Sequence, residues 1–132
     1  MRIYSSRILT HGSCIAKNMK IHNSAVIEEL KLVRKRMERL GESFRLSKES
    51  ALEDPDAEAL EKLRERSKSV YQMEIAECLR DVRRLKLLIT SDQPGMEAAD
   101  DLAELCRKEG ESLLAHLVST PNRLIRVYKA GG

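Results

Sequence analysis

Histidine and cysteine side chains that lie close together in a chain could bind a metal ion. His11 and Cys14 have a ligand-like spacing, and His22 follows them. A structural zinc site needs four ligands, whereas the remaining cysteines, Cys78 and Cys106, lie far away within apolar helical patterns. We therefore expect no metal site, and we interpret Cys78 and Cys106 as small core residues.

Nucleophilic catalysis would need a nucleophile, a base and a group that orients the base. His116 is followed by Ser119 and Thr120, but no acidic motif accompanies them. Glu74 and Glu77 are expected on a solvated face, without the Glu-x-x-His pairs of di-iron bundles. Aromatic residues make up 3% of the chain, whereas ligand pockets are usually lined by them. We expect no catalytic residue, no cofactor and no small-molecule substrate.

The cysteine content and the composition of the N-terminal residues indicate in which cellular compartment the protein lies. Three cysteines among 132 residues do not form a disulfide framework, which indicates a reducing compartment. Residues 1–27 contain no Asp or Glu, but they carry Arg, Lys and several Ser residues. That composition is typical of a mitochondrial targeting segment. We expect a mitochondrial location, with the cytoplasm as the alternative, and no transmembrane segment.

The elements that would position any functional group are helices. Along residues 24–47, apolar residues recur at spacings of four and three, the period of helices that pack side by side. Asn23 or Ser24 is expected to cap this helix. Because a narrow apolar stripe is buried by another helix, we expect this seam to hold a helical hairpin. The seam residues are Val26, Leu30, Val33, Met37, Leu40 and Phe44.

Two further helices are predicted. A turn at residues 53–56, with Asp56 as the cap, precedes a long helix over residues 57–89. A third helix over residues 95–118 is expected to fold back on the end of the hairpin, to be weakened at Gly110 and to end at Pro121. The chain is thus predicted to be all-α, with a long antiparallel, coiled-coil-like hairpin plus a third helix in residues 23–118.

Arms are expected on either side of these helices. Residues 1–22 would form a basic N-terminal arm. Residues 119–132 would form an extended C-terminal arm, in which residues 124–128 have the composition of a short strand.

Basic residues form two clusters, one on each helix of the predicted hairpin. In an antiparallel hairpin the two clusters would meet at the base and could contact a protein partner or phosphates. Aromatic residues that could stack on bases are absent beside them, which disfavours sequence-specific RNA recognition. The clusters are Lys31, Arg34, Lys35 and Arg39, and Arg80, Arg83, Arg84 and Lys86.

From Leu52 the chain reads Leu-Glu-Asp-Pro-Asp, and a charged helix follows that ends Arg-Arg-Leu-Lys-Leu-Leu-Ile-Thr-Ser-Asp at Asp92. This stretch resembles the N-terminal hairpin of class I peptide-release factors and is also similar to small helical chaperones of type III secretion. The Gly-Gly-Gln loop that carries the chemistry of release factors is absent from this sequence. We assign no family on this basis.

The sequence favours a non-catalytic structural or assembly subunit of a large protein complex. A mitochondrial ribosomal subunit or a respiratory-chain accessory subunit fits the basic arms. One alternative is a small dimeric helical chaperone or adaptor, in which a second chain completes the seam. The other alternative is an RNA-binding helical module.

Overall fold

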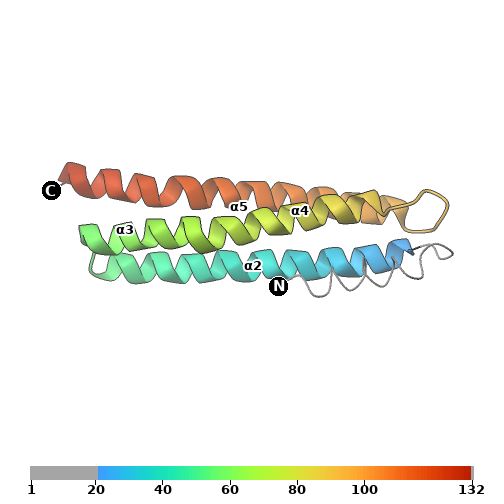
Figure 1. The fold of residues 1–132 in the computed structure, drawn as a ribbon, viewed down its shortest axis with the longest axis horizontal. Coiled ribbons are helices and arrows are strands. Elements are labelled where there is room, and N and C mark those ends of the chain that lie inside the picture. Colours follow the sequence, from blue (N-terminus) through green and yellow to red (C-terminus); the bar gives the residue numbers. More distant parts are fainter. Residues whose placement is uncertain (1–20, 132) are drawn as a thin grey trace.

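The computed structural model describes residues 21–131, which form three long helical rods (Figure 1). The prediction of an all-α protein with three packed helices is confirmed, and no strand occurs within the described range. The first rod is α2 (Asn23–Glu53), the second joins α3 (Ala57–Arg66), the π-helix η1 (Ser67–Gln72) and α4 (Met73–Leu87), and the third is α5 (Met96–Gly131).

The rods lie side by side along their length. Figure 1 shows α2 and α5 running in one direction, while the rod from α3 to α4 runs in the opposite direction. α2 packs on α4 and α5, and α5 also packs on α3 and α4. The predicted antiparallel hairpin is therefore present. The third helix was expected to pack on one end of the hairpin. It instead lies along the whole hairpin.

The turn between the first two rods lies where the sequence places it. α2 continues beyond residue 47 and ends at Glu53, because Asp54 precedes a proline and leaves the helical conformation. The Oδ1 atom of Asp56 accepts a hydrogen bond from the backbone N–H of Ala59 at 2.7 Å. Asp56 is thus the N-cap of α3, as predicted.

Pro121 does not end the third helix, and the predicted extended arm at residues 119–132 is wrong for the part that the structure describes. α5 continues to Gly131, with Thr120, Pro121 and Ile125 buried. These residues follow Leu117 at helical spacing. The short apolar run at residues 124–128 is therefore the last part of a helical stripe and not a strand.

A serine on the second rod explains how α5 passes through a proline. Pro121 has no backbone N–H, so the carbonyl of Leu117 loses its helical donor. The hydroxyl of Ser67 donates to that carbonyl at 2.6 Å, and Nε2 of Gln72 donates to it at 3.3 Å. Ser67 is fully buried, and Ser67 and Gln72 are the first and last residues of the π-helix η1.

At Gly110 the backbone of α5 lies close to side chains of two other helices. A Cβ atom at this position would lie 2.6 Å from Cδ2 of Leu79 and 3.0 Å from Sδ of Met37. Its position within a helix predicts a weak point. In the structure the space beside Gly110 is filled by the side chains of Leu79 and Met37, which a larger residue would have to displace.

Replacement of Gly110 by alanine should destabilise the protein. Overpacking of a filled core costs about 1–3 kcal/mol, which exceeds the gain of about 1 kcal/mol in helix propensity. The matched control is Gly41→Ala, whose Cβ would meet Leu113 at an ordinary 3.5 Å and which should raise stability. Urea unfolding of both variants checks this. Equal effects of the two substitutions would contradict the close approach at Gly110.

The role of Ser67 can be tested with a double-mutant cycle. Ser67→Ala should cost about 1–3 kcal/mol, since it removes a donor from a buried carbonyl. In a Pro121→Ala background the same substitution should cost at least about 1 kcal/mol less, because the new backbone N–H can donate to Leu117. The free energies of unfolding of the four proteins measure the coupling. An equal cost in both backgrounds would refute the link between Ser67 and Pro121.

Candidate functional site

The seam predicted on α2 lies inside the bundle. Five of its six residues are buried and the sixth is partly buried against the core. Since α4 and α5 both pack on α2, the seam is covered within one chain, and a partner would have to contact another surface. The buried residues are Val26, Leu30, Val33, Met37 and Phe44, and the partly buried residue is Leu40.

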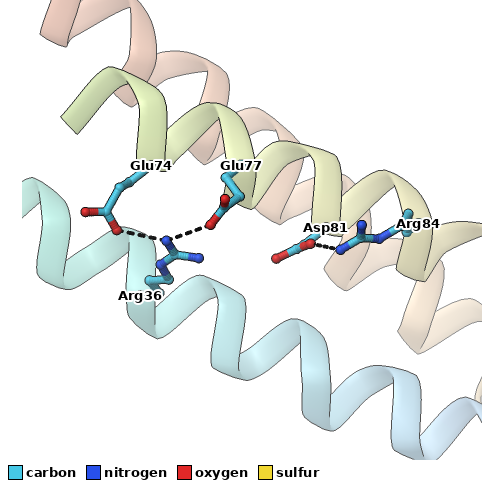
Figure 2. Close-up of polar contacts among 5 residues, drawn as sticks. All are labelled: Arg36, Glu74, Glu77, Asp81 and Arg84. Atoms are coloured by element: carbon cyan, nitrogen blue, oxygen red, sulfur yellow. Dashed lines mark hydrogen bonds and ion pairs between the residues drawn. The ribbon is translucent and has the colours of Figure 1, made fainter. Parts of the chain in front are cut away.

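An ion-pair network joins α2 to α4 (Figure 2). Nη2 of Arg36 lies 2.8 Å from Oε1 of Glu74 and 3.0 Å from Oε1 of Glu77, and the Arg36 side chain is only 14% exposed. The expectation that these glutamates face only solvent is therefore wrong. One guanidinium held by carboxylates one turn apart favours a single register of the two helices. One signal for this position of Arg36 was present in the sequence, because Arg36 directly precedes the seam residue Met37 and so lies next to the buried side of α2.

Arg34, one of the eight predicted contact cations, binds α5 instead. Its Nε and Nη2 atoms lie 2.8 Å and 2.9 Å from the two carboxylate oxygens of Glu109. The hydrogen bonds from Arg34 lower the pKa of Glu109 below its usual value. This bidentate pair ties the first rod to the third.

Two further cations of the predicted patch also have acidic neighbours. Lys31 pairs with Glu28 at 3.2 Å on the surface of α2. Arg84 is bonded to the buried carboxylate of Asp81 on the same helix (Figure 2). The remaining five cations are exposed, and none of them belongs to an ion pair within residues 21–131. They are Lys35, Arg39, Arg80, Arg83 and Lys86.

A groove of about 570 Å³ lies between the end of α4 and the start of α5, and two of these five cations line it. Leu87 is 84% exposed and Met96 is 39% exposed, so the groove offers apolar surface beside positive charge. We call it the loop-end groove. Its lining residues are Arg83, Lys86, Leu87, Ile89, Ser91, Met96 and Asp100.

Lys86, which lines the loop-end groove, interacts electrostatically with Glu104 of α5. Lys86 contributes to a lowered pKa of Glu104, although the main cause is the hydrogen bond from Arg107 to that carboxylate. Glu104 is thus already engaged by Arg107, at short range. Lys86 remains an exposed cation without an ion pair in the described part of the chain.

Asn23 makes four hydrogen bonds to the connection that borders the groove. Nδ2 of Asn23 donates to the carbonyls of Thr90, Gln93 and Pro94 at 2.8, 3.3 and 3.3 Å, and its Oδ1 accepts from the N–H of Thr90 at 3.0 Å. Asn23 was expected to cap α2, but its fully buried side chain instead binds a segment about 70 residues away. No local sequence pattern indicates such a pairing.

His116, Cys78 and Cys106 are the groups for which the sequence raised catalysis or metal binding. Nδ1 of His116 lies 3.0 Å from Oγ1 of Thr120, and the imidazole packs edge-on against Phe44. Burial lowers the pKa of His116, as do the nearby positive charges. Burial also raises the pKa of Cys78 and of Cys106 to about 11, so both are neutral thiols in the core, as predicted.

Within residues 21–131, no three His, Cys, Asp or Glu side chains are grouped to hold a metal ion. His11 and Cys14 lie outside the described residues. None of the helices in this range has the length and apolar character needed to cross a membrane.

The chain was compared with family models, curated proteins and solved structures, and it matches none of them. The loop-end groove is therefore interpreted from its own residues.

Replacement of Asn23 by alanine should loosen the loop-end connection. The loss of a buried group that both donates and accepts costs about 1–3 kcal/mol. The control is Ser24→Ala, because Ser24 is exposed and makes no such contact, and it should change stability little. Urea unfolding measures both. If Ser24→Ala were the more damaging substitution, the capping interpretation would be right and the present one wrong.

Proposed function

We propose that this protein is a non-catalytic assembly subunit that joins a large protein complex through helix contacts. The observation that carries the proposal is the loop-end groove, where the exposed side chain of Leu87 lies beside Arg83 and Lys86. Exposed apolar surface rimmed by polar groups is typical of protein interaction sites.

The rest of the bundle supports an interaction role at this end. The seam on α2 is buried by α4 and α5, so the three helices cover their main apolar stripes within one chain. The long rods carry ion pairs between helices, such as that between Arg34 and Glu109. A three-helix rod with an exposed apolar groove bordered by cations at one end suits a protein that holds a fixed place in an assembly.

The cellular location and the kind of host complex that we propose are those that the sequence favours. The acid-free composition of residues 1–27 suggests mitochondria, where a ribosomal or a respiratory-chain complex would be the host. The exposed cations Lys35, Arg39 and Arg80 could add contacts to RNA or to acidic proteins. A free dimeric chaperone and an RNA-binding module are the competing functions, and the experiment below distinguishes them.

The proposal predicts a large native complex that depends on Leu87. Tagged full-length protein, purified gently from its native cells, should elute in a megadalton particle. Leu87→Asp should release it, because a carboxylate would replace exposed apolar surface at the contact. The matched control is Leu32→Asp, a 43% exposed leucine on α2 that does not line the groove, and it should leave the particle intact.

Size-exclusion chromatography with mass spectrometry, before and after RNase treatment, reads out these outcomes. Elution as a small dimer, alone or with one client protein, would favour the chaperone and contradict the proposal. Binding that is lost on RNase treatment and unaffected by Leu87→Asp would favour the RNA-binding module.

A further inference from the structure

The outer side of α4 has the form of an unused helix-packing stripe. Met73, Arg80 and Leu87 recur every seven residues, a spacing that keeps side chains on one side of a helix. Met73 is 65% exposed and Leu87 is 84% exposed. This stripe leads along α4 to the loop-end groove, to which Leu87 also belongs.

At the end of α4 that borders the loop-end groove the exposed charges are positive, whereas Glu74 and Glu77, near the start of α4, are bound to Arg36. Arg80, Arg83 and Lys86 are exposed, and none of them forms an ion pair within the described residues. Asp100, which is half-buried, is the one acidic residue that lines the groove. Some other arginines of the bundle are paired. Arg45 and Arg107, for example, each contact two glutamates on their own helix.

These charges disfavour two occupants that the same chain could provide. A two-fold contact between copies through this side of α4 would bring Arg80 and Arg83 close to their equivalents, and like charges at an interface are unfavourable. The N-terminal segment is no better matched in charge, since residues 1–20 carry Arg2, Arg7, Lys17 and Lys20 without any acid.

From this surface we infer that the partner places an acidic amphipathic helix along α4 and into the loop-end groove. Its apolar side chains would cover Leu87 and Met96, and its carboxylates would meet Arg83 and Lys86. A helix laid into a groove between two helices buries its apolar stripe in the way that bundle helices do. This inference rests on the proposed function and specifies the chemistry of the partner.

The test uses the full-length chain and two synthetic helical peptides. Both peptides have the same leucine seam, and the flanking positions are all Glu in one peptide and all Lys in the other. Fluorescence anisotropy should show roughly tenfold or greater preference for the Glu peptide, since attraction at two cations becomes repulsion in the other peptide. Leu87→Ser should weaken binding of the Glu peptide.

Charge reversal provides the stricter test. The double variant Arg83→Glu, Lys86→Glu should reverse the preference towards the Lys peptide. The matched control, Arg123→Glu with Arg126→Glu, changes two exposed cations near the other end of α5 and should keep the original preference. Far-UV circular dichroism of each variant verifies that the helices are intact.

Several results would overturn the inference. These are equal binding of the two peptides, binding of neither, or a preference that the groove variant does not change. Vesicles of phosphatidylserine and phosphatidylcholine form a separate arm. If the chain bound these vesicles through Arg83 and Lys86 while it ignored peptide charge, the surface would be a membrane site. If a Leu87-dependent native complex formed without any peptide preference, the proposed function would stand and this inference alone would fail.

Discussion

The backbone carbonyl of Leu117 is the constraint on which the length of this bundle depends. Pro121 removes its helical donor, and an unsatisfied buried carbonyl would cost about 1–3 kcal/mol. Ser67 and Gln72, at the two ends of a π-helical turn, donate to it from the neighbouring rod. The irregularity of the second rod and the proline of the third thus compensate each other, and α5 can continue as a straight helix over the whole length of the hairpin (Figure 1).

A full-length third helix determines which surfaces are left for partners. Because α5 packs on α2, α3 and α4, the α2 seam is covered inside the chain. Gly110 allows the close contact of α5 with Leu79 and Met37, and Arg36 fixes α2 against α4 through two glutamates (Figure 2). The apolar surface beside positive charge at the end of α4 is left uncovered by the three helices, which is why we propose it as a contact site.

Much of the fold could be predicted from the sequence because its signals are local. The 3.5-residue period around Met37 and the cap at Asp56 depend on nearby residues alone. The passage through Pro121 could not be predicted, since its compensation comes from Ser67, more than fifty residues earlier. The role of Asn23 likewise depends on a distant loop. Of the predicted basic patch, five cations have no ion pair in the described part of the chain. That Arg34 differs from them could not be predicted, because its partner Glu109 lies on another helix.

The most direct test of this account is hydrogen–deuterium exchange of the protein in its native complex compared with the free protein. We expect added protection over residues 80–100, which include the end of α4, the connection and the start of α5, with little change on α2. Protection centred on the outer side of α2 or on the turn at residues 54–56, with unchanged exchange over residues 80–100, would contradict the assignment of the loop-end groove as the contact site.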